Sequence, residues 1–337
     1  MFCRRLLESG PRIDWARRDD YEYLIVSEFD IIPERLAALP LVLDGLDIEA
    51  LSQPVAAGGM RRTTLVRLQG CGEEGLGEDV TFQDDDRLCT KPAETLWRGV
   101  TTLGDLWDRL DQADLFDRPP RYEVVRNYRR WAIEAAALDI ALRQANLGLA
   151  EFLGLRLRPV HFVVSPPRIH LRRFPGLRLK VDTDGLEPGL PIDVIDFKGQ
   201  GSGALVRRAF HQYPEALFED PPKIVDGVRV SWDTRIHTAA DIRRLTERPD
   251  AVNIKPARVG SVRALFEIYG ECRSTGIGMY GGGQHELGPG RAQIQVLASL
   301  IHPDAPNDVA PVAYNAADPP DLLTLSPLVL TESLGFG

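Results

Sequence analysis

Charged residues stand at the carboxyl ends of successive short apolar runs in the second half of the chain. Lys255, for example, directly follows the run 251–254. In a barrel of parallel strands, all carboxyl ends open into one mouth, and such barrels keep their chemistry there. A single charged residue at a strand end usually does no more than face water, so the hypothesis rests on the whole set. Its members are Lys180, Asp182, Asp196, Lys198, Glu219, Asp220, Asp233, Lys255, Gln284 and Glu286.

Three members of this set are carboxylates on consecutive runs, namely Asp196, Glu219 and Asp233. They lie 23 and 14 residues apart, which places them on neighbouring strands and not on one helix face. Three oxygen donors from separate strands can hold a hard cation such as Mg²⁺ and leave positions open for water or substrate. The spacing therefore predicts a Mg²⁺ site, with Mn²⁺ as the alternative ion.

Two lysines, Lys180 and Lys255, flank the carboxylates along the chain. A lysine near a metal ion and a second cation has a lowered pKa and can act as a base near neutral pH. The combination predicts removal of a proton next to a carboxylate, with the metal stabilising the enediolate. Strand alternation points Lys198 the same way as Asp196, so its ammonium could pair with Asp196, compete with the metal or stand in for it.

The elements that position these residues follow from the rhythm of the chain after Pro159. Short apolar runs alternate with helical stretches, as expected for βα units and a parallel sheet. Seven strand candidates fit within about 130 residues, whereas a full eight-unit barrel takes about 250. We therefore expect a shortened TIM-like (β/α) barrel over residues 156–337.

The first part of the chain has a different pattern. Residues 48–82 indicate antiparallel strands with a Gly-rich turn, and 93–113 and 122–155 are helical. Residues 1–45 are harder to place and hold one strand-like run, "EYLIVSEFDII" at 22–32. The pattern predicts an α+β capping domain over residues 1–155, and hence an α/β protein of two domains.

Composition limits the classes of partner. The net charge is 40 minus 49, or −9, which argues against a nucleic-acid groove. No run reaches 18 apolar residues, so no membrane span is expected. Cys3, Cys71, Cys89 and Cys272 share no metal-binding spacing, and we expect free thiols in a reducing, cytoplasmic compartment.

Several motifs together carry a family resemblance from about Ile48 to the C-terminus. They are "TTLVRLQGCGEEGLGE" and "AIEAAALDIALRQANLGLAEFLGL" in the first part, and "LRLKVD", "VIDFKG", "LFEDP", "SWDTR", "VNIKPARVGSV" and "MYGGGQHELG" in the second. With these motifs the chain resembles the enolase superfamily, in its mandelate racemase and muconate-lactonizing, o-succinylbenzoate synthase-like branch. The late motifs are the most specific, and "LRLKVD" is the weakest.

The resemblance implies roles for individual residues. Asp196, Glu219 and Asp233 would be metal ligands, and Lys180 and Lys255 the acid/base lysines on opposite faces of the substrate. The loop 54–60, with Gly58 and Gly59, would close over the mouth and help to set specificity. Gln284, Glu286 and Lys198 would help to hold the substrate, with His285 on the other face. The implied function is a Mg²⁺-dependent lyase or isomerase acting on a small carboxylate by dehydration, cycloisomerisation or epimerisation. The family's habit leaves a homo-oligomer open.

The chain departs from the family pattern at two positions and in one connection. Arg178 replaces the first lysine of the Lys-x-Lys pair, and Lys198 replaces the Asn beside the first metal ligand. The connection after Lys180 is too short for the family's usual helix. An alternative therefore stays open, in which the barrel has lost its metal and acts as a ligand-binding or interaction protein.

Overall fold

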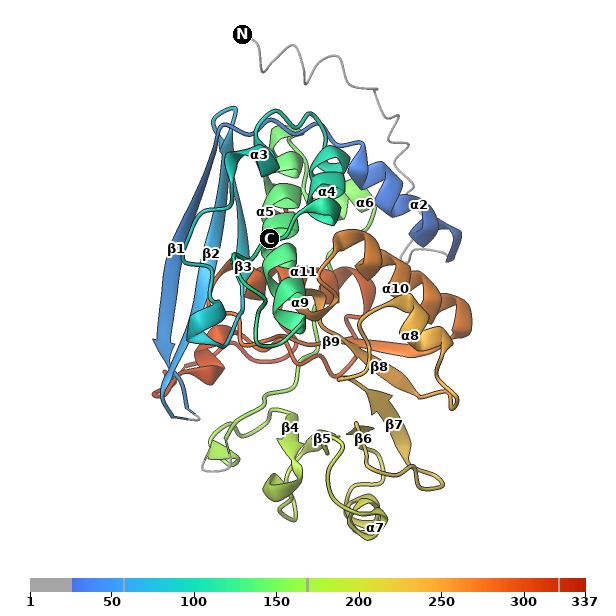
Figure 1. Cartoon of the computed structure of the whole chain (residues 1–337). Coiled ribbons are helices and arrows are strands. Elements are labelled where there is room, and N and C mark those ends of the chain that lie inside the picture. The colour runs from blue at the N-terminus through green and yellow to red at the C-terminus, as the bar shows by residue number, and fades with distance from the viewer. Residues whose placement is uncertain (1–25, 57, 168–169, 321) are drawn as a thin grey trace.

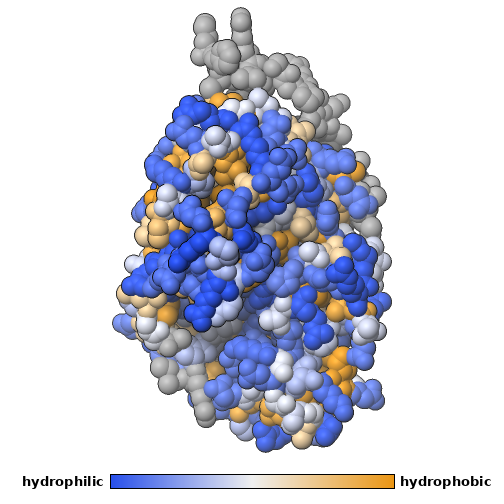
Figure 2. Space-filling view, in the orientation of Figure 1, coloured by the Kyte–Doolittle hydropathy of each residue, from blue (hydrophilic) through white to orange (hydrophobic). Residues whose placement is uncertain are grey.

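The computed structural model describes residues 26–56, 58–167, 170–320 and 322–337, and it has two parts (Figure 1). The first holds a three-stranded antiparallel sheet, and the second holds six parallel strands in sequential order. This is the predicted fold class, an α+β cap followed by a shortened parallel barrel, and it is confirmed. On the face seen in Figure 2, hydrophilic residues predominate and apolar residues are scattered.

The cap is built on strands β1 (Gly45–Pro54), β2 (Met60–Gly70) and β3 (Glu73–Asp79). Helix α5 (Val124–Gln144) packs its backbone closely against β3. A Cβ at Gly77 would lie 2.0 Å from the carbonyl oxygen of Ala132, and one at Gly75 would lie 2.2 Å from that of Ala136. Only glycine allows this approach, so the Gly-x-Gly of the sequence sets how the helix seats on the sheet. The other cap elements are η1 (Asp84–Asp86), α3 (Glu94–Trp97), α4 (Leu103–Gln112) and α6 (Leu149–Leu153).

The strand predicted at 22–32 is wrong over its described part. Residues 26–37 form helix α2 (Val26–Ala37), and residues 22–25 lie outside the described residues. Phe29, Ile32 and Leu36 are buried at helical spacing of three and four residues. They cover helix α10 (Val262–Thr275) of the barrel, where the rings of Phe29 and Tyr269 lie 6.3 Å apart. The β-branched residues favour a strand, but this tertiary packing outweighs their propensity.

The barrel strands are β4 (Leu179–Asp182), β5 (Ile192–Asp196), β6 (Leu217–Glu219), β7 (Arg229–Trp232), β8 (Ala251–Ile254) and β9 (Gly278–Gly281). Three isolated parallel bridges join the two edges of this sheet, namely Val164 with Leu179, Phe162 with Asn307, and Gly282 with Asp308. The predicted strand at 160–165 is thus present only as bridges. This segment and the segment around 307–308 add two β segments to the six strands. The eight together close the ring.

Helices follow only some of the strands. They are α7 (Gly203–Gln212), α8 (Ala239–Arg243), α9 (Pro256–Val259), α10 (Val262–Thr275) and α11 (Pro289–Ile301), with the short helices η3 (Thr183–Gly185) and η4 (Val312–Asn315). Only η3 separates β4 from β5, and no helix separates β6 from β7. The barrel is therefore shortened because connections have lost helices, while its strand positions are kept.

Cysteine pairing differs from the sequence-based expectation. Cys71 is disulfide-bonded, whereas Cys89 and Cys272 are free thiols, and Cys3 lies outside the described residues. Pairing depends on which sulfur atoms meet in space, and sequence spacing does not report that. Within the described part of the chain, no helix combines the length and the apolar composition needed to cross a membrane.

Candidate active site

The fold brings the predicted carboxylates to neighbouring strand ends. Asp196 closes β5 and is the direct register partner of Glu219, which closes β6. Glu219 in turn is opposite Ser231 of β7, and Asp233 follows two residues later. Because side chains alternate along a strand, Ser231 and Asp233 face the same side. All three carboxylates therefore lie along one stretch of the barrel mouth.

Glu219 is fully buried and surrounded by hydrogen-bond donors. Lys180 Nζ lies 2.7 Å from its Oε1, and Asn253 Nδ2 lies 3.1 Å from its Oε2. The hydroxyl of Tyr280 also donates to Oε2 and lies 3.0 Å from the hydroxyl of Ser231. Burial raises the pKa of Glu219 to about 7, although the neighbouring Lys180 works in the opposite direction. Both oxygens of this carboxylate are thus occupied by protein groups.

The ammonium of Lys180 lies between several carboxylates. Besides Glu219, it lies 3.4 Å from Asp308 Oδ2 and 3.9 Å from Asp196 Oδ2. Burial alone would lower the pKa of Lys180, but Glu219, Asp308, Asp233 and Asp196 together raise it well above its usual value. The lowered pKa expected from the sequence therefore does not hold for Lys180 in this arrangement. Here Lys180 carries a proton and can donate it.

Asp233 forms the second ion-pair cluster. Its Oδ2 lies 2.8 Å from Lys255 Nζ, and its Oδ1 lies 2.5 Å from Arg258 Nη1. Arg258 also donates to the carbonyl oxygen of Asp233, at 2.8 Å. Burial opposes ionisation of Asp233, yet Lys255 and Arg258 outweigh it and hold the pKa of this carboxyl well below its usual value. Asp233 is therefore ionised and firmly held.

The two departures from the family pattern lie away from the space between the carboxylates. The exposed ammonium of Lys198 pairs with Asp182, while only its backbone N–H bonds to Asp196 Oδ1, at 2.9 Å. Arg178 is exposed and pairs with Asp193, with 2.7 Å from Nε to Oδ1. The register of β4 against β5 shifts between Leu179 and Lys180, and Asp193, the partner of Arg178, is the residue of β5 that this shift skips. Lys198 thus does not stand in for a metal; Lys180 lies next to Glu219 and Asp196 instead.

The carboxylate oxygens of the site are of the type that binds a hard divalent cation, but protein ammonium and guanidinium groups already pair with them. Asp196, Glu219 and Asp233 offer carboxylate oxygens, and the buried Oδ1 of Asn253 has no hydrogen-bond partner. In the arrangement described above, however, Lys180, Lys255 and Arg258 already neutralise these carboxylates. Across residues 26–56, 58–167, 170–320 and 322–337, no three His, Cys, Asp or Glu side chains are placed to hold a metal ion. A cation at this site would have to displace Lys180 from Glu219 and at least one of the two cations, Lys255 or Arg258, from Asp233.

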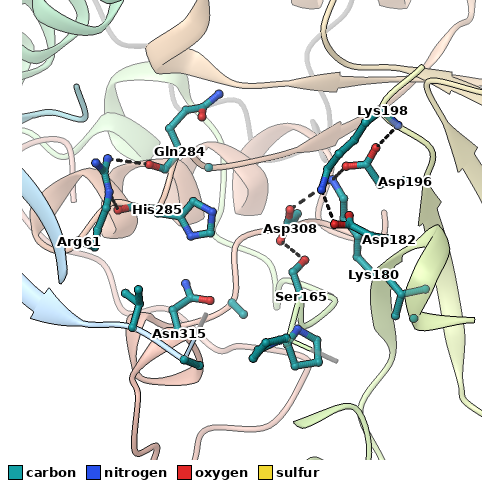
Figure 3. A pocket seen from close by; sticks show the side chains of 18 of the residues that line it. Arg61, Ser165, Lys180, Asp182, Asp196, Lys198, Gln284, His285, Asp308 and Asn315 are labelled. Carbon is teal, nitrogen blue, oxygen red and sulfur yellow. Dashed lines mark hydrogen bonds and ion pairs between the residues drawn. The ribbon is translucent and has the colours of Figure 1, made fainter. Parts of the chain in front are cut away.

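A cavity of about 640 Å³ opens above these residues between the barrel and the cap. Figure 3 shows Arg61, Gln284 and His285 on one side, Lys180, Asp182, Asp196 and Lys198 on the other, and Asp308 with Ser165 between them. Lys255 also lines the cavity, as do cap residues of the β1–β2 turn and after β3, including Val55, Met60 and Phe82.

The remaining predicted residues take different places. Gln284 lines the cavity, and so does His285, for which the opposite face was predicted; that prediction is wrong. Glu286 is buried, accepts the N–H of Gln284 at 2.7 Å, and lies 3.0 Å from Arg291 Nη2. Gly58 and Gly59 have φ of 88° and 85°, in the left-handed region that favours glycine. They shape the turn whose neighbours Val55, Ala56 and Met60 line the cavity.

Three residues of the site have no local pattern in the sequence that would predict them. Asp308 reaches Lys180 from the segment that closes the barrel, Tyr280 reaches Glu219 from inside β9, and Arg61 enters from cap strand β2. Arg258 is different, because its place near Lys255 in the sequence predicts that it binds a substrate carboxylate or caps the fold. It holds Asp233 from helix α9, directly after β8.

Comparisons with known proteins agree with this architecture. Residues 34–152 match the N-terminal domain, and 188–316 the C-terminal domain, of the family described as domain of unknown function (DUF8230). A comparison with curated proteins finds no match.

Several solved structures share the fold. Muconate cycloisomerase from Pseudomonas fluorescens is 19% identical over 88% of this chain and 96% of that chain, with a TM-score of 0.64. A mandelate racemase/muconate lactonizing protein from Herpetosiphon aurantiacus is 18% identical over 80% and 89%, with a TM-score of 0.63. A dipeptide epimerase from Enterococcus faecalis V583, complexed with Mg and the dipeptide L-Leu-L-Tyr, is 16% identical over 88% and 99%, with a TM-score of 0.63. The chain thus carries both domains of DUF8230, and its fold is that of the enolase superfamily, as its motifs indicate.

Proposed function

We propose that the chain is an isomerase or lyase that moves a proton at the carbon next to a carboxylate. The observation that carries this proposal is the pair of lysines, Lys180 and Lys255, which line one cavity and each lie beside a carboxyl group. Two ammonium-bearing groups on one cavity can act on opposite faces of a bound substrate.

The two lysines would have complementary tasks. One, as the free amine, takes the α-proton, and the other, as the ammonium, returns a proton to the opposite face or to a leaving group. Lys180 is taken as the protonated partner because Asp308, whose Oδ2 lies 3.4 Å from its ammonium, stays beside it when the other carboxylates bind a metal ion. This assignment makes Lys255 the base and Lys180 the acid in the first half of the reaction, with the roles reversed in the other direction.

We propose Mg²⁺, with Mn²⁺ as alternative, as the cofactor, held by Asp196, Glu219 and Asp233. Bound there, the ion would supply positive charge to the enediolate oxygens of the substrate. The donor types support this, and the dipeptide epimerase of the same fold is complexed with Mg. Lys180 would first release Glu219, which leaves Asp308 as the partner within reach of its ammonium.

Of the possible reactions, we propose an isomerisation in preference to a dehydration. Two of the proteins with the same fold are a muconate cycloisomerase and a dipeptide epimerase. Epimerisation needs only the two lysines and their protons, which is the simplest use of the geometry.

Exchange of the α-proton in D₂O, followed by NMR over a panel of carboxylates that includes dipeptides, tests the proposal. We expect exchange with at least one member, and a loss of at least about 100-fold in Lys255→Met and in Lys180→Met. Lys91→Met, at an exposed ion pair with Asp47 in the cap, should exchange like the wild type.

Calorimetric titration with Mg²⁺ tests the cofactor separately. Wild-type binding should disappear in Glu219→Gln and tighten in Lys180→Met, because removal of the ammonium frees Glu219. A wild type that neither binds Mg²⁺ at millimolar concentration nor exchanges any α-proton would contradict the proposal.

A further inference from the structure

The turn that carries His285 has an unusual backbone. His285 has φ of 56°, in a left-handed region that residues other than glycine seldom adopt. Such a conformation persists only where the surrounding structure holds it, and it is frequent at functional sites. The turn is held by Glu286, whose carboxylate accepts the N–H of Gln284, and by Arg61 of the cap.

Arg61 serves as a clamp on this turn. Its Nε–H donates to the carbonyl oxygen of His285 at 3.1 Å, and Nη2 donates to that of Gln284 at 3.0 Å. The other donors reach the carbonyl oxygens of Arg62, Thr81 and Val80, at 2.9, 3.4 and 2.7 Å. A guanidinium has five N–H groups, and all five are used. Arg61 therefore has no donor left for a ligand, although it lines the cavity, and its buried side chain fixes where the imidazole of His285 points.

The imidazole itself is available. It points toward the middle of the cavity, with Asp308 on the far side (Figure 3). Its ring lies edge-on to Phe82, with centroids 6.2 Å apart, and within the described residues its nitrogens make no hydrogen bond to the protein. The residue is exposed to the cavity, and desolvation by the surrounding protein, followed by the charge of Arg291, lowers the pKa of its ring. A neutral imidazole offers one N–H donor and one acceptor.

Two large apolar side chains stand exposed in the same cavity. Met60 is 48% and Phe82 47% exposed, although both types are usually buried, and both line the cavity with His285. A ligand that covered them would remove apolar surface from water. Opposite them lie the charged groups Lys180, Lys255 and Asp308. The cavity is thus charged at the barrel end, and apolar with one neutral hydrogen-bonding ring at the cap end.

We infer that His285, Phe82 and Met60 form a substrate-recognition subsite, here named the His285 subsite. It takes a neutral polar group, such as an amide or hydroxyl, joined to an apolar body. The substrate class is then a carboxylate that carries an amide or hydroxyl and an apolar or aromatic tail. This inference rests on the proposed function for the carboxylate end, and it assigns His285 to binding and not to proton transfer.

Binding of two probes tests the subsite without any need for turnover. N-acetyl-phenylalanine carries carboxylate, amide and phenyl ring, whereas 3-phenylpropionate lacks the amide. By calorimetry, the wild type should bind the first at least about 10-fold more tightly, as expected for one well-placed hydrogen bond.

Substitution of His285 tests whether its ring is the source of this preference. His285→Gly should bind both probes alike. His285→Asn, which keeps a donor and an acceptor and tolerates this φ, should recover part of the preference. His237→Gly is the matched control, since that exposed ring bonds only to the carbonyl oxygen of Thr234 and does not line the cavity.

The glycine variant separates recognition from a structural role. Glycine accepts a φ of 56° without strain, so His285→Gly should melt no lower than the wild type while it loses the preference. An unchanged preference in His285→Gly, or a wild type that binds neither probe at 5 mM (about 100-fold weaker than typical substrates), overturns the inference. Loss of the preference together with a lower melting temperature also overturns it in favour of a structural role. A retained preference for the amide in a protein that exchanges no α-proton would contradict only the proposed function.

Discussion

At the scale of single residues, the site is a set of charges that compensate one another. Glu219 has no contact with water and accepts from Lys180, Asn253 and Tyr280. A buried carboxylate is tolerated only where such donors replace water. The hydroxyl of Tyr280 is the one donor to Glu219 that comes from β9, and it couples this strand to Ser231 of β7.

Tyr280→Phe should therefore destabilise the fold by about 1–2 kcal/mol. The substitution leaves Ser231 without its side-chain partner and removes one donor from Glu219, and a buried polar group that loses its partner costs this much. Urea denaturation followed by circular dichroism measures the change. Tyr122→Phe is the control, because the ring of Tyr122 is 47% exposed in the cap. Equal midpoints for Tyr280→Phe and the wild type would show that the hydroxyl contributes nothing.

At the scale of elements, helix α5 connects the parts of the molecule. Asp139 on this helix accepts the N–H of Leu76 in β3 at 2.9 Å and the N–H of Phe336 near the C-terminus at 2.8 Å. Phe336 is buried, and its ring packs against Trp131 with centroids 6.2 Å apart. In the first turn of the helix, Asn127 donates to the carbonyl oxygen of Arg258 at 2.6 Å, next to the site. The helix thus joins the cap sheet, the C-terminal segment and the barrel.

Asp139→Asn should cost about 2–3 kcal/mol of folding free energy. The amide nitrogen of Asn donates where Asp139 accepts, so one buried backbone N–H loses its partner and the pair with Arg143 is weakened. Chemical denaturation gives the value, and limited proteolysis at the C-terminal segment 331–337 reports whether it comes loose. Glu123→Gln, an exposed position just before the same helix, should leave both unchanged. A stable Asp139→Asn variant with a protected C-terminal segment would argue against the connection.

At the scale of the whole molecule, hydrogen bonds of buried polar groups join the cap to the barrel. Glu78 at the end of β3 accepts the N–H groups of Leu287, Gly288 and Gly290, at 2.6, 2.9 and 3.2 Å. Arg61 makes the matching contact to the turn at 284–285. The cavity lies between these contacts, so its shape depends on how the two parts are joined.

The contribution of His302 to global stability should fall as the pH falls from about 6.5 to about 4. Its ring is buried, and its Nδ1 lies 2.7 Å from Asn307 Oδ1 in the segment that closes the barrel. Burial lowers the pKa of His302 from 6.5 to about 4, so in this window the unfolded chain binds a proton that the folded protein excludes. The contribution is therefore complete above pH 6.5 and is lost below it, by up to about 3 kcal/mol, while the raised pKa of Glu219 acts with the opposite sign.

A pair of variants isolates this contribution. Urea denaturation at several pH values gives the free energy of unfolding. Between pH 6.5 and 4, the loss of this free energy should be smaller in His302→Gln than in the wild type. His237→Gln should follow the wild type. Identical slopes for His302→Gln and the wild type would contradict the role given to burial.

The sequence by itself determined the order of the elements and the residues at the strand ends. Asp196, Glu219, Asp233, Lys180 and Lys255 could be predicted because parallel strands all open at one edge and side chains alternate along each strand. These are local rules that need no knowledge of the partner segment. The cap hairpin and its helix follow from periodicity in the same way, and the motifs added the family resemblance.

Only the tertiary structure decided which side chains contact one another in the site. Arg258, Tyr280 and Asp308 reach the site from a helix, a strand interior and a barrel-closing segment, and Arg61 reaches the turn of His285 from the other domain. The run at 26–32 became a helix because it packs on α10, against its strand propensity. Such contacts join residues far apart in the chain, so local periodicity carries no record of them. The electrostatic state of Lys180, which depends on four carboxylates from separate segments, follows from those contacts alone.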